Sequence, residues 1–564
     1  MVVESVFGLK DHLTRFIVAS VICLFSGAVL AQATDESTEE NTEQIVYEAP
    51  APATPLAEAI QTRLNEDDGS TLGDGADSRA LAIYTFYEDY AYQPIWVDDA
   101  GPNDNAAALI DALRRAGEDA LHPADYQPEL LADMANTATT LPEFAEVEIS
   151  LSKVFVDYAT HLAAGRVEPN KFNREINLFP GAPDPADILT GIADTEDFTD
   201  YILALAPNTP NYDRLKRALA VYRQKAEDGG WPLVPEGEVL KPGMDDPRVP
   251  ILRTRMVAQD LYQGDGENDR TLYEGDIVDA IKRFQERHGL EVDGVIGKNT
   301  LAQINVPIEQ RIQQMELNME RRRWMKDDLG YKYVFANLAD QAIKVVKGTK
   351  TIHWARIVVG KPYHRTPVFS ENMTYAVVNP YWNVPRSISV NEYLPKLRKN
   401  PGALRAQNIR VLSGKNEFDP TSVPWGNYSK SNFPFRLRQD PGKGNALGRI
   451  KFMFPNKFNV YIHDTPSKSL FTRASRAFSH GCMRVQDPIA LGAVLLADEG
   501  WDQASLDGLV ANGKKRVIKL KEPVPVHVTY LTAWANKDGS IHFRRDVYDR
   551  DTQLSKALTR VQTN

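Results

Sequence analysis

The chain has 564 residues, and its 65 Lys and Arg residues against 76 Asp and Glu residues give a net charge of -11. Hydrophobic residues make up 43% and charged residues 25%, as in an ordinary folded protein, and near-average Gly and Pro contents exclude a low-complexity chain. The length predicts about three or four domains, because a domain holds roughly 100–200 residues. The acidic balance argues against a nucleic-acid binder, which would need a basic face.

An apolar run, residues 16–30, lies near the start of the chain. It follows Lys10 and Arg15 and precedes the small-x-small pattern Ala31-Gln32-Ala33. These features are typical of a secretory signal peptide, here residues 1–33. The run is shorter than the about 20 residues that a spanning helix needs, and an uncleaved N-terminal anchor is the alternative. Cleavage would remove two basic and two acidic residues and leave the net charge at -11.

The chain contains two cysteines, Cys23 and Cys482, and only Cys482 lies outside the predicted signal peptide. A single cysteine in the mature chain forms no internal disulfide. In an oxidising compartment such a thiol is either buried and inert or kept for its reactivity, and the composition leaves both alternatives open.

The residues after the signal predict a linker and then a helical domain. Residues 34–54 hold six acidic residues, no basic residue and an Ala-Pro run, which predicts a disordered, extended linker. Apolar residues at helical spacing mark 104–116 and 147–164, as well as the face formed by Leu56, Ile60 and Leu64. We therefore predict a helical scaffold domain over residues 55–245.

Residues 246–306 predict a second, smaller helical unit. Ile277, Ala280, Ile281 and Phe284 share one helix face, and Asn299 or Thr300 is expected to cap a short helix that ends at Ile304. The run IKRFQERHGLEVDGVIGKNTLAQIN resembles the three-helix peptidoglycan-binding domain of cell-wall enzymes in the order and spacing of FQ, GL, DG, IG and T. The resemblance implies glycan binding, and a packing module without a ligand is the alternative.

A linking helix is predicted over 307–327, with the basic run 321–323 on a solvated face. From 328 to 550 short alternating apolar segments predict a β-rich domain, interrupted at about 389–435 by a polar helix-and-loop insertion. A helix at 488–498 follows, with Asp487 at its N-cap, and a closing strand pair, 524–534 and 540–543, turns at Asp538-Gly539. The predicted fold class is multidomain α+β.

The mature chain's one cysteine lies in the run Ser479-His480-Gly481-Cys482. An unperturbed thiol has a pKa of about 8.5, so a nucleophilic cysteine needs a base, and His463 and His480 are the candidates. An adjacent imidazole lowers the thiol pKa by several units and makes the thiolate dominant. Gly481 can adopt positive φ, and backbone amides beside the thiol can form an oxyanion hole.

Strand periodicity separates the two histidines. In the predicted strand 459–463, Val460 and Ile462 point into the core, so Tyr461 and His463 are expected to face the site. The direction of His480 depends on the turn at the following glycine, and alternation does not assign it.

The segment from His463 to Arg484 resembles the catalytic motif of L,D-transpeptidases, which is a histidine, a spacer of bounded length and Ser/Thr-His-Gly-Cys. Here 15 residues separate His463 from Ser479, and Arg484 follows the cysteine. Residues 379–385 and 438–448 resemble the family's substrate-lining strand and the approach to its catalytic strand. With the scaffold and peptidoglycan-binding segments, most of residues 55–550 resembles the large, multidomain periplasmic type of this family, with a cap insertion in its catalytic domain.

The resemblance implies a role for each residue of the motif. Cys482 matches the nucleophile, and His463 matches the general base and acid, with the Asp464 carbonyl orienting its imidazole. The supporting or oxyanion-stabilising positions that it implies are Tyr461, Asp464, Ser479, His480, Gly481 and Arg484, with Arg484 supporting the site or binding a substrate carboxylate. Trp382 is expected to line the substrate, and a role in the core alone is its alternative.

The reaction that the resemblance implies is acyl transfer between peptide stems of the cell wall. The Cys482 thiolate would attack the third stem residue, and His463 would return the thiol proton to the leaving D-amino acid. A side-chain amine of another stem would then give a 3→3 crosslink in peptidoglycan synthesis, which supports cell-wall biogenesis and cell shape. Water would give L,D-carboxypeptidation instead, and a protein or a free D-amino acid are further acceptors.

The implied partners are peptidoglycan stem peptides and glycan, in the periplasm, with no nucleic acid and no assigned protein partner. No metal or organic cofactor is implied. The family's inactivation by carbapenems follows from acylation of the same cysteine.

Other classes of protein stay open at this point. Cys482 could be an inert core residue, or form a metal site with His463, Asp464 and His480, although paired ligand spacing is missing and a metal would quench the thiol. A sortase-like transpeptidase also orders His, Cys and Arg, but would lack the Ser-His-Gly-Cys run. A non-catalytic wall-binding protein is the last alternative, and the intact pair of His463 and Cys482 argues against it.

We expect the exported protein to begin near Thr34, because the small-x-small pattern ends at Ala33. N-terminal sequencing of protein isolated from the periplasm checks this expectation. Retention of residues 16–30 in that material would contradict cleavage and indicate a membrane-anchored protein.

Overall fold

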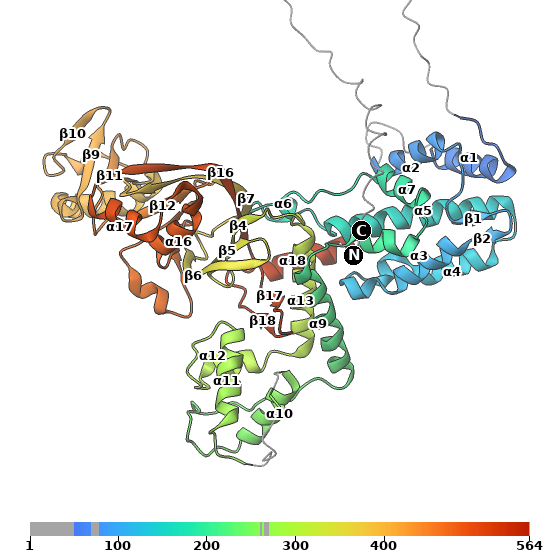
Figure 1. Cartoon of the computed structure of the whole chain (residues 1–564), viewed down its shortest axis with the longest axis horizontal. Helices are drawn as coiled ribbons and strands as arrows, with labels where there is room; N and C mark the ends of the chain where they lie inside the picture. Colours follow the sequence, from blue (N-terminus) through green and yellow to red (C-terminus); the bar gives the residue numbers. More distant parts are fainter. Residues whose placement is uncertain (1–49, 69–77, 260–261, 264–269, 563–564) are drawn as a thin grey trace, which may run out of the picture. The chain divides into compact units, whose positions relative to one another are not determined.

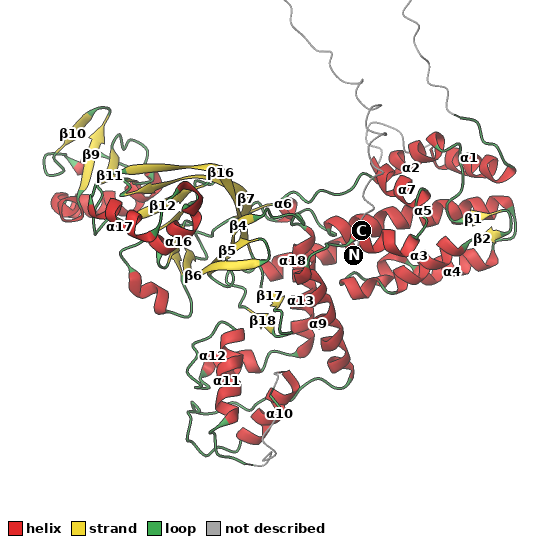
Figure 2. Cartoon of the chain, viewed as in Figure 1, coloured by secondary structure: helices red, strands yellow, loops and turns green. Residues whose placement is uncertain are grey.

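The computed structural model describes residues 50–68, 78–259, 262–263 and 270–562. The predicted signal peptide, 1–33, and most of the predicted linker, 34–54, lie outside the described residues. Within the described ranges, no helix has the length and apolar character needed to span a membrane. The fold is multidomain α+β, as predicted, with helices before residue 324 and a β-rich part after it (Figures 1 and 2).

The N-terminal part is helical, as the apolar spacing predicts. Its α-helices are α1 (Pro55–Asp68), α2 (Ser78–Asp89), α3 (Asp104–Arg114), α4 (Pro128–Thr137), α5 (Leu141–Ala164), α6 (Pro169–Phe172), α7 (Pro185–Ala193), α8 (Phe198–Leu205) and α9 (Pro210–Glu227). Helix α5 contacts α1, α2, α3, α4, α7 and α8, so it forms the centre of the bundle (Figure 1). Leu56, Ile60 and Leu64 of α1 are all buried, which confirms the predicted face.

A buried carboxylate on α5 fixes the chain that leads from α2 to α3. The Glu148 oxygens accept hydrogen bonds from the Ile95 amide at 2.7 Å, the Trp96 amide at 2.8 Å and the Tyr87 hydroxyl at 2.6 Å. Strand β1 (Val97–Asp98) and its partner β2 (Gly101–Pro102) follow directly. Burial raises the pKa of Glu148 to about 7, although these donors oppose the rise. The packing of the bundle interior therefore includes a buried carboxylate that is held by three hydrogen bonds.

The predicted small helical unit contains α10 (Val249–Gln259), α11 (Asp276–Arg287) and α12 (Lys298–Ile304). The predicted apolar face of α11 is confirmed, because Ile277, Ala280, Ile281 and Phe284 are all fully buried. The buried Gln285 ties the following turn, since its Oε1 accepts hydrogen bonds from the Asp293 and Gly294 amides.

The expected N-cap of α12 is wrong by two or three residues. Gly297 occupies the N-cap position, and the buried Thr300 lies inside the helix, where its hydroxyl faces the Val295 carbonyl at 3.3 Å and the Gln285 side chain at 3.4 Å. Thr300 is thus used to close the turn onto α11, a tertiary role that a capping pattern does not reveal.

Helix α13 (Ile308–Arg323) lies within the predicted linking helix 307–327, but its basic run does not lie on a solvated face. Arg321 and Arg323 are only 4% and 2% exposed. Arg321 pairs with Asp551 at 2.6 Å, and Arg323 pairs with Glu320 at 3.2 Å and contacts the Tyr212 hydroxyl at 2.7 Å. The expectation failed because elements from both ends of the chain bring partners to this turn, and paired charges can be buried.

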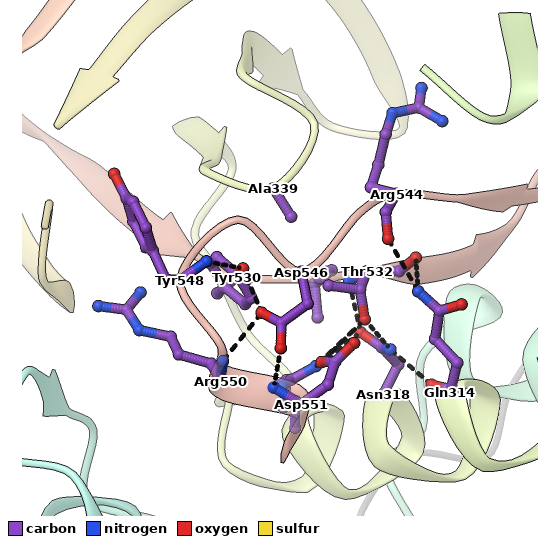
Figure 3. Close-up of polar contacts among 12 residues, drawn as sticks. Gln314, Asn318, Ala339, Tyr530, Thr532, Arg544, Asp546, Tyr548, Arg550 and Asp551 are labelled. Carbon is purple, nitrogen blue, oxygen red and sulfur yellow. Dashed lines mark hydrogen bonds and ion pairs between the residues drawn. The ribbon is translucent and has the colours of Figure 1, made fainter. Parts of the chain in front are cut away.

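The C-terminal segment closes over the same end of α13. It contains the strand pair β17 (Ala533–Ala535) and β18 (Ile541–Phe543) and the helix α18 (Arg550–Gln562). Figure 3 shows Asn318 of α13 beside Thr532, whose hydroxyl also donates to Asp551 at 3.1 Å. Asp546 accepts from the Tyr530 hydroxyl at 2.6 Å and from the Arg550 amide at 2.8 Å, so this carboxylate starts α18.

The β-rich part is a closed sheet. Its strands are β4 (Lys332–Asn337), β5 (Ala342–Lys347), β6 (Lys350–Gly360), β7 (Val368–Val378), β12 (Ile450–Met453), β13 (Ile462–His463), β14 (Ala477–Ser479), β15 (Met483–Val485) and β16 (Arg516–Thr529). The hydrogen-bonded order is β12-β13-β15-β6-β5-β4-β16-β7, and β7 pairs again with β12, which closes a barrel. Strand β14 pairs with β6, and β3 (Ile176–Asn177) adds to β7.

The barrel interior holds the main apolar core, which the predicted alternation identifies correctly for β4, where Val334 and Ala336 are fully buried. Helices α16 (Pro488–Leu495) and α17 (Gln503–Ala511) pack on β6 and β7. The predicted helix 488–498 is too long, and Asp487, at its N-cap with φ 46°, makes no side-chain cap. The predicted closing pair is also too long, because residues 524–529 belong to β16, which pairs with β4 and β7.

The insertion predicted at about 389–435 is a small unit with its own apolar cluster. Four strands, β8 (Trp382–Asn383), β9 (Ile409–Ser413), β10 (Asn416–Phe418) and β11 (Arg436–Gln439), pair in the order β10-β9-β11-β8 beside helices α14 (Arg386–Ile388) and α15 (Leu394–Lys399). Leu397, Val411, Trp425 and Leu437 form its core. The helix-and-loop prediction missed β9 and β10, which lie inside 389–435, because they are only five and three residues long.

We expect Glu148→Ala to lower the local free energy of unfolding of α5 by about 2–4 kcal/mol, because two buried amides would lose their acceptor and the Tyr87 hydroxyl would keep only Ser152 as a partner. Hydrogen-exchange mass spectrometry of α5 peptides measures the effect without requiring the whole chain to unfold in one step. Glu129→Ala, at an exposed ion pair with Arg114, is the control and should leave protection unchanged. Equal protection of α5 in Glu148→Ala and the wild type would contradict this account.

Candidate active site

Two neighbouring parallel strands bring the predicted residues together. Strands β13 and β15 pair in the register Ile462↔Met483 and His463↔Arg484. Ile462 and Met483 are buried in the barrel core, so the residues next to them in the sequence point to the outer face of the sheet. Cys482 directly precedes β15, where the Met483 amide donates to the Tyr461 carbonyl at 3.1 Å.

The orientation predicted for Tyr461 and His463 is confirmed, since their rings lie 5.6 Å apart. The predicted strand 459–463 is nevertheless shorter, and β13 begins at Ile462. The reason lies in Asn459, which adopts φ 54°, and in Asn456, whose side chain bonds both the amide and the carbonyl of Val460. A side chain thus replaces the partner strand at this position.

The His463 imidazole is 5% exposed and is held by the backbone. Its Nδ1 lies 2.5 Å from the Asp464 carbonyl oxygen, as expected, and because a carbonyl only accepts, Nδ1 carries the proton. In the neutral ring, Nε2 is then the free acceptor. Burial, followed by the positive charge of Arg484, lowers the pKa of His463 to about 3. The imidazole is therefore uncharged at neutral pH.

The Asp464 side chain is buried, and its carboxylate binds residues other than His463. Its oxygens accept from the Arg449 amide at 2.8 Å, the Thr465 amide at 2.7 Å and the Lys468 ammonium. Burial alone would raise the pKa of Asp464, but Lys468 and these amides together hold it below its usual range. A Cβ at Gly448, which has φ 61°, would lie 2.3 Å from the Asp464 carboxyl carbon, so this turn requires glycine.

Cys482 is a half-buried free thiol whose sulfur lies 3.7 Å from the Asn459 carbonyl oxygen. Burial raises the pKa of the Cys482 thiol, and Tyr461, Arg484 and Lys451 offset only part of the rise. Burial therefore favours the neutral thiol here over the thiolate that an adjacent imidazole can stabilise. The reason is that the neighbouring imidazole is itself uncharged and supplies no cation to stabilise a thiolate.

The turn before the thiol is fixed by Ser479, whose buried hydroxyl donates to the Cys482 carbonyl at 2.6 Å. The same oxygen accepts from the Gly481 amide at 3.1 Å, and Gly481 has φ 114°, which favours glycine. Across the described part of the chain, no group accepts a hydrogen bond from the Cys482 amide. This amide is therefore left for an oxygen of a ligand, which suits an oxyanion hole.

His480 lies at the rim of the site and points toward the insertion. Its Nε2 is 2.7 Å from a carboxylate oxygen of Glu392, and its side chain is 34% exposed. Its ring lies 5.1 Å from that of His364. The structure thus separates His480 from the group formed by Tyr461 and His463.

Trp382 belongs to the insertion in its packing. It is half-buried on β8, beside the cluster of apolar insertion residues, with its ring 6.4 Å from that of Tyr393. Its predicted place along the substrate stays a prediction.

Lys451 lies on β12 opposite His463 and is a site residue outside the predicted motif. Its ammonium is 5.1 Å from the centre of the Tyr461 ring, and burial, followed by the charge of Lys515, lowers its pKa. The alternation of Ile450 and Phe452, both buried, with Lys451 is the signal that places it on the outer face. Two cations, Lys451 and Arg484, therefore border the thiol.

Among the described residues, no three His, Cys, Asp or Glu side chains are arranged to hold a metal. A cavity of about 490 Å³ lies elsewhere on the barrel, where Lys332, Lys347 and Trp501 are among its lining residues. It contains none of the predicted site residues.

Three family models match separate parts of the chain. A scaffold domain matches residues 82–219, a "putative peptidoglycan binding domain" matches 246–304, and an L,D-transpeptidase catalytic domain matches 331–500. A protein of Haemophilus influenzae, named "Putative L,D-transpeptidase", is 32% identical over 246 residues. That match covers 43% of this chain and 49% of the relative, so it spans about half of the relative's length.

Solved L,D-transpeptidase structures are similar to the chain at low identity. L,D-transpeptidase 1 of Mycobacterium tuberculosis is 12% identical, covering 35% of this chain and 59% of that protein with a TM-score of 0.15. The structure from Xylanimonas cellulosilytica is 14% identical, covering 52% and 98% with a TM-score of 0.16. That from Stackebrandtia nassauensis is 14% identical, covering 55% and 99% with a TM-score of 0.20.

Strand pairing and the hydrogen bonds around Cys482 and His463 set the geometry of the site, which lies within the region that matches the catalytic domain. The chain therefore contains, in this order, regions that match a scaffold domain, a putative peptidoglycan-binding domain and an L,D-transpeptidase catalytic domain.

Proposed function

We propose that this protein is a cysteine-dependent L,D-transpeptidase that forms 3→3 peptidoglycan crosslinks through an acyl-enzyme on Cys482. One observation carries the proposal. His463 lies on β13, and Cys482 directly precedes the parallel partner strand β15, inside the region that matches the catalytic domain, and the Cys482 amide donates to no group in the described chain. Peptidoglycan stem peptides and glycan are the proposed substrate and partner.

The first step starts from a neutral thiol and a neutral imidazole. As Sγ of Cys482 attacks the stem carbonyl, Nε2 of His463 takes the thiol proton, so charge develops only when the reaction occurs. The Asp464 carbonyl keeps the proton on Nδ1 and thereby keeps Nε2 available. The Cys482 amide donates to the oxygen of the reacting carbonyl.

The imidazolium then gives its proton to the nitrogen of the leaving D-amino acid, and the peptide bond breaks as the thioester remains. Its low pKa favours this transfer, because the buried ring holds a proton weakly. An amine of a second stem attacks the thioester, releases the thiol and forms the crosslink. Water in place of the amine gives L,D-carboxypeptidation, and an amine on a protein gives anchoring to the wall.

The charges around the thiol support an anionic substrate. Arg484 and Lys451 lie on the face that carries Cys482, and the Nε of Arg484 is buried with no hydrogen-bond partner within the described ranges. Both cations would suit the carboxylates of a peptide stem. Tyr461 and Ser479 support the site through packing and through the turn.

The remaining parts fit a wall enzyme that works outside the cytoplasm, in the periplasm after removal of residues 1–33. We assign 55–245 as scaffold, 246–306 as glycan-binding module, 307–327 as linking helix and 328–550 as catalytic domain. Acylation by carbapenems and a contribution to cell-wall biogenesis and cell shape belong to the same proposal.

We expect Cys482→Ser to abolish the covalent adduct with a carbapenem, because a serine hydroxyl is far less acidic than a thiol. His463→Ala should slow acylation by about 10²- to 10⁴-fold, since it removes the general base. Intact-mass spectrometry over time measures both effects on the full chain. His122→Ala, at an exposed histidine of the scaffold, is the matched control and should acylate at the wild-type rate.

His480→Ala separates the two histidines of the motif. Because His480 pairs with Glu392 at the rim, its loss should slow acylation less than His463→Ala does. A larger loss in His480→Ala than in His463→Ala would reverse the assignment of the base. Muropeptide analysis after expression in a host that lacks 3→3 crosslinks then tests whether a second stem is the acceptor.

The pH dependence follows from the low pKa of His463. Its imidazole stays neutral until the pH falls to about 3, so the base should not be lost between about pH 7 and pH 5. Arg484→Gln removes a cation that disfavours imidazolium, so it should raise the pKa of His463 and move the acidic limb upward. The rate of carbapenem acylation, measured against pH for the wild type and for Arg484→Gln, locates the acidic limb of each protein. A wild-type limb near pH 6.5, the pKa of an ordinary histidine, would contradict this environment.

A further inference from the structure

We propose that Thr366 is a positioning residue for acyl transfer, which holds the Gly481 carbonyl and so aims the Cys482 amide at the reacting carbonyl oxygen. This inference rests on the proposed function of Cys482. Thr366 is 0% exposed, and its hydroxyl donates to the Gly481 carbonyl at 2.8 Å. The Gly360 amide donates to the same hydroxyl oxygen at 3.0 Å, which leaves the single hydroxyl proton for Gly481.

The hydrogen bond acts on the amide because both belong to one peptide unit. The Gly481 carbonyl and the Cys482 amide share a planar trans peptide, in which the C=O and N–H bonds point in opposite directions. Fixing the carbonyl therefore fixes the direction of the amide. Gly481 has φ 114°, a region open to many conformations for glycine, so this peptide needs an external partner to select one.

Ser479 binds the backbone groups that flank the Gly481–Cys482 peptide and leaves the Cys482 amide free. Its hydroxyl accepts from the Gly481 amide and donates to the Cys482 carbonyl. The Cys482 amide, between these groups, has no acceptor in the described chain. Ser479 and Thr366 thus bind the Gly481 amide, the Gly481 carbonyl and the Cys482 carbonyl, and only the Cys482 amide between them stays free. A free donor with a fixed direction is what an oxyanion needs.

Thr366 is itself held by residues beyond the matched catalytic region 331–500. The Tyr548 hydroxyl donates to the Gly360 carbonyl at 2.7 Å, and the Arg550 guanidinium donates to the Thr366 carbonyl at 3.0 Å. Arg550 also contacts Glu175 at 3.2 Å, in the segment that leads into β3. Figure 3 shows Tyr548 and Arg550 at the start of α18.

Two reactions at the same sulfur distinguish positioning of the amide from a general structural role. Acylation by a carbapenem turns the lactam carbonyl oxygen into an oxyanion, so it needs the Cys482 amide. Alkylation by iodoacetamide forms a bond from sulfur to a saturated carbon and releases iodide, so no oxyanion develops. A change that only misdirects the amide should therefore affect acylation and spare alkylation.

The variants are Thr366→Val, which keeps the shape and removes the hydroxyl, and Thr366→Ser, which keeps the hydroxyl. We expect Thr366→Val to slow carbapenem acylation of the full chain by about 10- to 100-fold. Its rate of alkylation by iodoacetamide, and the dependence of that rate on pH, should stay within about twofold of the wild type, and Thr366→Ser should restore most of the acylation rate.

Thr529→Val is the matched control. Thr529 is a buried barrel residue whose hydroxyl donates to the Ala336 carbonyl at 3.3 Å, away from the site, so its loss should change neither rate. An unchanged acylation rate in Thr366→Val would overturn the inference. So would parallel losses of acylation and alkylation, or a Thr366→Ser variant as slow as Thr366→Val. A wild-type protein that is alkylated but never acylated would instead contradict the proposed function.

Discussion

Strand pairing in the barrel places Cys482 and His463, because β13 pairs directly with β15, and the pairing of β12 with both β13 and β7 closes the barrel beside them. Strands β13 and β15 are parallel, and a parallel pair needs a connection of about a dozen residues or more to bring the chain back. The residues between His463 and Met483, which include β14, are that connection, and the 15-residue spacer of the motif is part of it. The spacing of the motif is therefore compatible with the parallel pair, and the register puts His463 and Arg484 on one outer face.

Burial sets the electrostatics of the site. The environment that lowers the pKa of His463 also raises that of Cys482, so the resting pair is uncharged. The backbone carbonyl of Asp464 contacts the His463 imidazole, whereas its carboxylate binds Arg449 and Lys468. The negative charge is thus neutralised away from the ring. In the proposed mechanism, such a site would keep its base available at neutral pH and would develop charge only as the thiol attacks.

Buried charges connect the barrel to both ends of the chain. Arg323 of α13 contacts Tyr212 of α9, and Arg321 pairs with Asp551 of α18. Arg550 joins Glu175 to the Thr366 carbonyl near the thiol. Each guanidinium is inaccessible to water and retains partners from distant segments, so removing either partner would leave a costly unpaired charge. The segments outside the matched catalytic region therefore belong to the support of the site.

The sequence by itself determined the helical and strand periodicities, the apolar face of Ile277, Ala280, Ile281 and Phe284, and the shared orientation of Tyr461 and His463. Local spacing is sufficient for these features, since it reports which side of an element is apolar. Only the tertiary structure decided that the basic run of α13 is buried, that Asn456 shortens β13, and that His480 turns toward Glu392. It alone revealed Thr366 behind Gly481. The burial of a charge, the direction of a turn and the pKa of a thiol depend on partners that distant segments supply, and local patterns carry no record of those partners.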